Sequence, residues 1–240
     1  MPLEHEHTVK AIQARLASEN KPNYLRDWVY GGIDGAITTF AIVAGVVGAG
    51  LSTKVIFVLG LANLIADGFS MAASNYSGTK TEVDELARFK DIEKKHIAQH
   101  PDGEREEVRQ IFLAKGLTGE ALEHTVAAIT SDQDVWINTM LTEEYGLSTR
   151  LRSPIRSGFS TFLAFLIFGT IPLLPYFLGV DNAFNISVVS TIIAFFAIGA
   201  IKSKWAVANW FKSGIETLII GVAASVLAYY IGYYASLIAQ

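Results

Sequence analysis

The chain has 240 residues, of which 51% are hydrophobic and 18% are charged, and its formal net charge at pH 7 is -4. Soluble domains carry about 25% charged residues, so this composition indicates a membrane protein. The acidic balance argues against a nucleic acid partner, because phosphate binding needs a basic face. The absence of cysteine excludes disulfides, thiolate metal sites and cysteine nucleophiles.

Residues 1–27 form a polar N-terminal segment, in which Val9 to Ala17 predicts a short amphipathic helix. The transmembrane region of residues 28–74 follows. Its first predicted span runs from Tyr30 to about Leu51, since about 20 apolar residues are enough to cross the hydrocarbon. This span is rich in small residues, so we expect it to pack tightly against another helix, such as its twin in a dimer. The second predicted span is Val55 to Ser74.

A large polar insert at residues 75–157 holds most of the 23 acidic residues. Because no proline lies between Val55 and Pro101, the second span and the start of the insert are predicted to form one continuous helix, read as far as Glu107. No alternating β pattern is present in the insert. Helical patterns separated by glycine-containing turns predict four helices: Thr79–Gln99, Glu104–Ala114, Ala121–Ile129 and Asp132–Tyr145.

Residues 158–240 supply three more spans, at about Phe159–Leu178, Phe184–Ile201 and Ile215–Ile238. Pro172 and Pro175 are expected to kink the third span or to end it early. The predicted fold is all-α, with five transmembrane helices, a cytosolic N-terminus and insert, and a C-terminus on the opposite side. This orientation follows from the basic residues that mark the cytosolic side: Lys10, Arg15, Lys21, Arg26, Arg150, Arg152, Arg156, Lys202, Lys204 and Lys212.

Asp34 and Asp67 are the carboxylates inside the predicted spans, and an ionisable residue within a membrane is a candidate functional residue by default. Asn63, Asp67 and Met71 recur every four residues and therefore share one helix face. Since the first two spans run antiparallel, we expect Asp34, Asp67 and Met71 at similar depth. Carboxylates with a thioether and an amide suit a divalent cation of intermediate hardness, such as Fe²⁺, Mn²⁺ or Co²⁺.

Each of these span residues also has a structural interpretation. Asp34 follows Gly31 and Gly32 and could cap the first span near the membrane interface. Asp67 could be a buried acid paired with a hydroxyl, and Met71 could fill the core. Their shared depth favours a translocation path.

Three predicted helices of the insert carry metal-ligating side chains about one turn apart: Glu93 and His96, Glu104 and Glu107, and Met140 and Glu144. Acidic helix faces with interspersed lysines are ordinarily solvated surface, so the spacing leaves that alternative open. Glu93 and His96 also match one half of a ferritin-like di-iron site, which needs a second Glu-x-x-His copy that the sequence lacks.

Four segments resemble the vacuolar iron transporter family: DGAITTFAIVAGVVGA, GLANLIADGFSMAAS, FGTIPLLP and MLTEEYGL. The resemblance covers nearly the whole chain from Trp28 onward, in the same order. Members of this family are five-span protomers that form dimers and move Fe²⁺, often also Mn²⁺, out of the cytosol in exchange for protons. The resemblance implies the same for this chain, with no prosthetic group.

The resemblance also implies roles for single residues. It places Asp34 and Met71 on the translocation path near the dimer axis. Asn63 and His96 stand where the family pattern leads us to expect carboxylates, and the imidazole adds Zn²⁺, Co²⁺ and Ni²⁺ as candidate ions. In the insert it implies metal ligands at Glu93, Glu104, Glu107, Met140 and Glu144.

We therefore predict a transporter and not an enzyme: a homodimeric exporter of divalent metal ions, coupled to protons and embedded in the lipid bilayer. The translocation path is predicted at Asp34, Asn63, Asp67 and Met71. The membrane would be the plasma membrane in a prokaryote and a vacuolar-type membrane in a eukaryote. A membrane-tethered ferroxidase and a metal sensor without transport remain as alternatives.

Overall fold

The computed structural model describes residues 6–17, 22–205 and 207–238. Every regular element in these ranges is helical, which confirms the predicted all-α fold. The predicted segment 1–27 is only partly covered, and Lys21, used in the orientation argument, lies outside the described residues. The elements are α1 Val9–Ala17, α2 Leu25–Gly48, α3 Thr53–Gln99, α4 Pro101–Ala114, α5 Gly119–Thr130, α6 Gln133–Glu143, α7 Pro154–Thr170, η1 Ile171–Leu173, α8 Leu174–Phe177, α9 Ala183–Lys202, η2 Ser203–Trp205 and α10 Trp210–Ile238.

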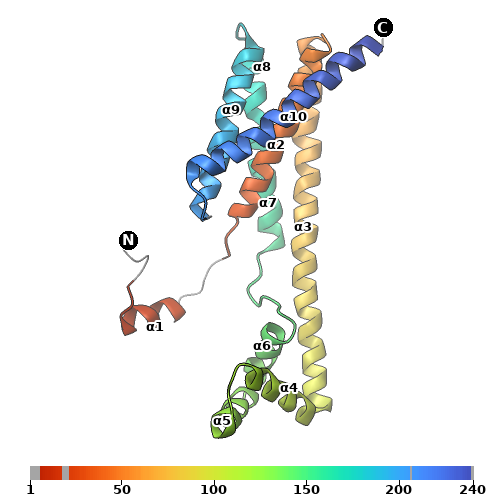
Figure 1. The fold of residues 1–240 in the computed structure, drawn as a ribbon. Coiled ribbons are helices and arrows are strands. Elements are labelled where there is room, and N and C mark those ends of the chain that lie inside the picture. Colours follow the sequence, from red (N-terminus) through yellow and green to blue (C-terminus); the bar gives the residue numbers. More distant parts are fainter. Residues whose placement is uncertain (1–5, 18–21, 206, 239–240) are drawn as a thin grey trace.

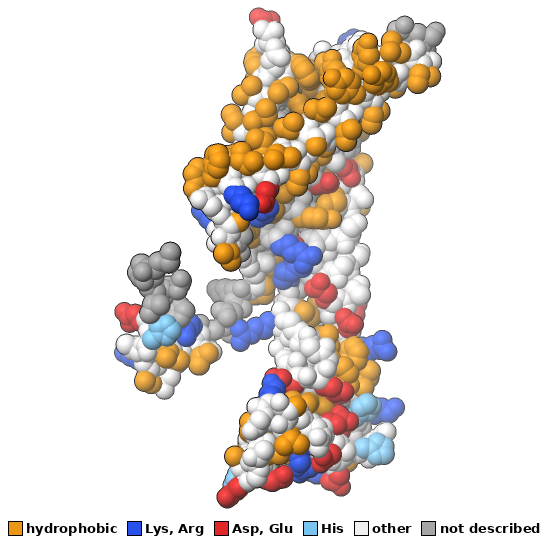
Figure 2. Space-filling view, viewed as in Figure 1, with side chains coloured by type: hydrophobic (Ala, Val, Ile, Leu, Met, Phe, Trp, Pro, Cys, Tyr) orange, Lys and Arg blue, Asp and Glu red, His pale blue; other side chains and the backbone are white. Residues whose placement is uncertain are grey.

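Five helical stretches in the described ranges are long and apolar enough to cross a membrane. They are α2, the first half of α3, α7 continued through η1 and α8, α9, and α10. Figure 1 shows them gathered at one end of the molecule, with the short helices α4, α5 and α6 at the other end. Apolar side chains cover the visible face of the five-helix bundle, whereas charged side chains gather over α4–α6 (Figure 2).

The helix α3 joins these two ends as a single unbroken element of 47 residues (Figure 1). It ends at Gln99 because the ring of Pro101 disfavours the helical conformation at the preceding residue, His100. His100 adopts φ -136° and ψ 54°. Pro101 then begins α4, where its missing N–H costs nothing. The continuous helix predicted from the sequence is confirmed as far as Gln99, and the turn after it is shorter than predicted.

The two prolines of the third span break it where the sequence predicts. α7 ends at Thr170, the chain tightens into η1, and α8 adds one more turn. The carbonyl of Pro172, which lies at this break, accepts a hydrogen bond from Ser187 Oγ of α9 at 2.7 Å. A neighbouring helix thus satisfies the backbone group that the break releases.

The small residues of α2 let two other helices approach it closely. A Cβ atom added at Gly35 would lie 2.5 Å from the carbonyl oxygen of Phe165 in α7. A Cβ added at Gly232 of α10 would lie 2.2 Å from the carbonyl oxygen of Gly45. The tight packing predicted for this span is therefore present within one chain, against α7 and α10.

Candidate metal sites

The first candidate site lies where α3 turns into α4. Glu93 and His96 come from the last turns of α3 and Glu104 from the first turn of α4, and one ligand atom from each lies within 4.8 Å of the others. His96 Nδ1 is 3.4 Å from Glu104 Oε1 and 3.9 Å from Glu93 Oε1. The chain reversal at His100 brings the two predicted pairs of ligands together.

This cluster buries carboxylates without enough positive charge to balance them. Glu93 is 0% exposed and Glu104 is 5% exposed, whereas the His96 side chain is 47% exposed. One oxygen of each glutamate has no hydrogen-bond partner in the described part of the chain. Burial, and then the charges of Glu93, Glu107 and Glu144, raise the pKa of Glu104 to about 7. A divalent cation would relieve this repulsion.

Two more of the predicted ligands surround the cluster. Burial, followed by the negative charges of Glu107 and Glu93, raises the pKa of Glu144, which caps the end of α6. Glu107 is exposed on α4, and its charge acts on both Glu104 and Glu144. Glu107 and Glu144 therefore lie near the cluster of Glu93, His96 and Glu104, and they add negative charge from α4 and from the end of α6.

The sequence reasoning missed Tyr145, which directly follows Glu144. Its hydroxyl donates a hydrogen bond to Glu93 Oε1 at 3.0 Å, and its ring packs against Phe89 at 4.5 Å between centroids. A donor of this kind fixes the orientation of a ligating carboxylate. Two features of the sequence could have pointed to Tyr145. It lies inside the segment MLTEEYGL, and its ring partner Phe89 lies one turn before Glu93 on α3.

The structure places Met140 differently from the carboxylates. Its side chain is fully buried in the hydrophobic core of the insert, which also contains Val108, Leu122, Val126 and Trp136. The cluster of Glu93, His96 and Glu104 does not include it. A role for Met140 as a metal ligand stays a prediction.

The second candidate site lies between α2 and α3, in the apolar half of the molecule. Asn63 Nδ2 donates hydrogen bonds to Thr38 Oγ1 at 3.1 Å and to Thr39 Oγ1 at 3.2 Å. Thr38 Oγ1 in turn donates to the carbonyl of Asp34 at 3.0 Å. These contacts tie the predicted polar face of α3 to the helix that carries Asp34.

The carboxylates of Asp34 and Asp67 lie close enough to interact electrostatically. Asp34, Asp67 and Met71 are all half-buried, and Met71 packs at the edge of the apolar core. Because α2 begins at Leu25, more than two turns before Asp34, the alternative in which Asp34 caps the first span is wrong.

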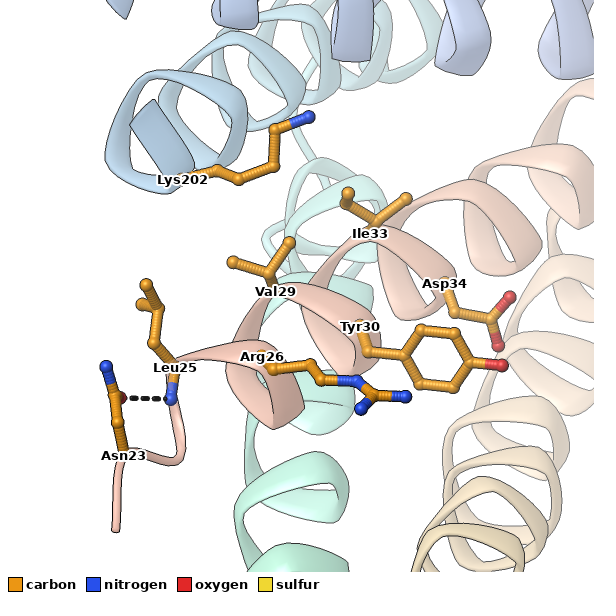
Figure 3. Close-up of a pocket in the computed structure, with 8 residues that line it drawn as sticks. All are labelled: Asn23, Leu25, Arg26, Val29, Tyr30, Ile33, Asp34 and Lys202. Carbon is orange, nitrogen blue, oxygen red and sulfur yellow. Dashed lines mark hydrogen bonds between the residues drawn. The ribbon is translucent and has the colours of Figure 1, made fainter. Parts of the chain in front are cut away.

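Asp34 also lines a cavity of about 630 Å³ beside the start of α2. Figure 3 shows its carboxylate and the Tyr30 ring on one side of α2, with Lys202 reaching across from the end of α9. The other lining residues are Asn23, Leu25, Arg26, Val29 and Ile33. Asp34 is the acidic residue of this lining, and its other charged residues, Arg26 and Lys202, are basic.

Comparison with known proteins shows that the chain is similar to vacuolar iron transporters over most of its length. Vacuolar iron transporter 1 of Arabidopsis thaliana is 32% identical over 208 residues, covering 85% of this chain and 83% of that protein. Vacuolar iron transporter 1 of Eucalyptus grandis is 30% identical over 226 residues, covering 90% and 91%. The vacuolar iron transporter of Toxoplasma gondii is 32% identical over 240 residues, covering 92% and 80%. A model of the VIT family matches residues 25–233, from α2 into α10, and the chain belongs to this family.

Proposed function

We propose that this chain carries divalent metal ions, Fe²⁺ foremost and also Mn²⁺, out of the cytosol across a membrane in exchange for protons. The single observation that carries this proposal is the continuity of α3. One unbroken helix bears Asp67 in its apolar half and Glu93 in its polar half, and so links an acidic cluster to carboxylates among the spans. The names of the similar proteins, vacuolar iron transporters, support iron as the cargo.

The insert would face the cytosol. Arg150 and Arg152 precede α7, and Arg156 lies in its first turn. Lys202 ends α9 and Lys204 follows it, whereas the loop between α8 and α9 carries Asp181 and no basic residue. Basic residues gather on the cytosolic side of membrane proteins.

This orientation can be checked by labelling, because the chain has no cysteine of its own. Lys94→Cys should react with an impermeant thiol reagent added on the cytosolic side, and Asp181→Cys only with reagent on the far side. The reverse pattern would overturn the orientation.

In the proposed mechanism, Glu93, His96 and Glu104 take an ion from the cytosol through the exposed side of His96. The ion then passes to Met71, Asp67 and Asp34 between the spans. Protonation of the two aspartates on the far side releases it, because protons and metal ions compete for the same oxygens. In this mechanism the insert collects the metal ion, and the carboxylates of the spans exchange it for protons.

A second copy of the chain would complete this path. Asp34 and Asp67 are only half-buried in one chain, and a carboxylate facing lipid is costly. Tyr30 and Phe69, near them on α2 and α3, are 60% and 68% exposed. A homodimer that packs these faces together would shield both aspartates from lipid, and cross-linking in membranes checks this arrangement.

Flux into proteoliposomes tests the proposal. The natural chain should move Fe²⁺ or Mn²⁺ into vesicles, faster with an acidic lumen, and Asp34→Ala or Met71→Ala should abolish that flux. Asp84→Ala is the matched control, since Asp84 is an exposed acid of α3 that pairs with Lys80. No flux by the natural chain would overturn the function, and normal flux in both span variants would overturn the path.

The same samples separate the two alternatives left open by the sequence. A ferroxidase would consume oxygen with Fe²⁺ in detergent, without a lipid barrier. A sensor would bind metal through the insert but show no flux.

A further inference from the structure

A polar cavity of about 250 Å³ lies at the joint between the bundle and the insert. It is placed along α3 between the two candidate sites, since Thr79 and Glu82 follow Met71 and precede Glu93. α2 and the segment before α7 form its other walls. Its polar residues are Arg26, Asp27, Tyr30, Ser74, Asn75, Thr79, Glu82 and Arg152. Arg26 and Tyr30 also line the cavity beside Asp34, whereas the other six belong to neither candidate site.

The central acid of this cavity is Asp27, which is 1% exposed. Its Oδ1 accepts hydrogen bonds from Arg152 Nη1 at 2.6 Å and from Asn75 Nδ2 at 2.9 Å. Its Oδ2 is buried and has no hydrogen-bond partner among the described residues. A buried carboxylate used at only one of its oxygens retains capacity for a further donor or a cation.

Two hydroxyls beside Asp27 are in the same state. Thr79, 2% exposed, lines the cavity, and its Oγ1 has no partner in the described part of the chain. The fully buried Ser157 has an unpartnered Oγ as well, and its carbonyl accepts from Asn75 Nδ2 at 3.2 Å. Buried polar atoms are almost always satisfied, so the unpartnered oxygens of Asp27 and Thr79, two residues that line the cavity, point to a ligand. Glu93 and Glu104 in the insert cluster leave oxygens over in the same way.

The chemistry of the cavity indicates a weakly held, partly hydrated divalent cation. All the free donors named here are oxygens, which suit hard, hydrated ions. Glu82 is exposed and opens the cavity to solvent. Arg152 is bonded to Asp27, and Arg26 lines the same cavity. These two positive charges lower the affinity for a cation and so favour release over storage.

We propose that this cavity is a third cation site, which relays a divalent metal ion between the insert cluster and the path at Asp67. This proposal rests on the proposed function. Glu82 lies about 16 Å from Glu93 and about 22 Å from Asp67 along the axis of α3, so the relay divides a gap that neither site spans.

Mn²⁺ titration of the full-length protein in detergent tests the site, with electron paramagnetic resonance reporting the free ion. The background carries Glu93→Gln, Glu104→Gln and Asp67→Asn, which weaken the two sites described above. We expect it to bind a further Mn²⁺ ion. Adding Thr79→Val with Glu82→Gln should weaken that binding by about tenfold.

The matched control is Thr81→Val with Asp84→Asn in the same background. It removes a hydroxyl and a carboxylate from the same helix, but both residues are exposed and lie outside the cavity lining. Unchanged Mn²⁺ binding in the control supports the site. Equal weakening in both pairs, or a background that binds no Mn²⁺, overturns it. Asp27 is left intact because its loss would also release Arg152.

Flux separates the relay from the proposed function. In the otherwise natural chain, Thr79→Val with Glu82→Gln should slow metal entry into proteoliposomes several-fold, with the control pair unchanged. Normal flux and normal Mn²⁺ binding in the cavity variant would overturn the relay and leave the transport function standing. Mn²⁺ bound in the cavity of a natural chain that moves no metal would instead overturn the transport function and the relay role together.

Discussion

The two halves of α3 present metal-ligating side chains in opposite settings. In the apolar half, Asp67 and Met71 are half-buried, and Asn63 is held by hydroxyl groups of α2. In the polar half, Glu93 is fully buried and faces Glu104 from α4. The apolar half thus carries few charged groups, which are only half-buried, whereas the polar half brings buried carboxylates close together.

Under the proposed function, this difference would separate a site that holds an ion from a site that passes it on. Crowded, buried carboxylates repel one another, and a cation that enters among them removes that repulsion, so binding is strong. A sparse group of half-buried ligands gains less from the ion and can exchange it with protons. Substitutions in one half should therefore leave the behaviour of the other half unchanged.

The largest expected effect is on transport in the apolar half. Asp67→Asn should reduce flux in proteoliposomes to background, because it removes the charge that both metal and proton require. The affinity of the insert for Mn²⁺, measured by calorimetry, should stay unchanged. A parallel loss of insert affinity would show that the two halves do not act separately.

In the polar half, Glu93→Gln combined with Glu104→Gln should lower the affinity for Mn²⁺ by about 100-fold, since two ligands are lost from one cluster. Calorimetry on the full-length protein measures this change. Glu120→Gln is the control, because Glu120 is an exposed acid beside His124 on α5. Unchanged affinity in the double variant would show that this cluster does not bind the ion.

The next largest effect should be a dependence of the metal affinity of the insert on pH. Since the pKa of Glu104 is raised to about 7, this ligand is protonated below that pH and ionised above it. Metal affinity should therefore fall about tenfold from pH 8 to pH 6, because a proton occupies the ligand oxygen. Calorimetry at both pH values checks this, and Glu104→Gln should flatten the change. A natural chain with pH-independent affinity would contradict the prediction.

The smallest expected effect comes from Tyr145→Phe. The variant loses the hydrogen bond to Glu93 Oε1 but no ligand, so we expect a loss of about 1 kcal/mol, or roughly fivefold in Mn²⁺ affinity. Flux should change little. Tyr76→Phe on α3 removes a hydroxyl away from the cluster and should have no effect on affinity.

Much of the fold follows from patterns within single segments. The absence of proline between Val55 and Pro101 predicts the unbroken α3, and Pro172 with Pro175 predicts the break after α7. Apolar runs locate all five long apolar helices of the described chain to within a few residues at most ends. α2 begins at Leu25, earlier than predicted, because the polar Arg26 and Asp27 disguise its first turn.

Contacts between distant segments could not be predicted in this way. Helix spacing predicted the pair Glu93 and His96 and the pair of Glu104 with Glu107, because the members of each pair lie on one face of one helix. The Tyr145 hydroxyl reaches Glu93 across 52 positions, and Arg152 reaches Asp27 across 125. Met140 shows the reverse difficulty, since the same one-turn spacing describes a ligand face and a core face. Periodicity fixes the face of a helix but not its neighbour.

Because α3 is unbroken, the number of its residues also determines how the insert is rotated relative to the membrane spans. Each residue turns a helix by about 100°, so one residue inserted between Thr79 and Glu93 would swing the whole insert about that angle around the axis. Seven inserted residues would nearly restore the original direction, about 10 Å farther from the bundle. The orientation of the insert about the axis of α3 is thus set by the number of residues that separate it from the spans.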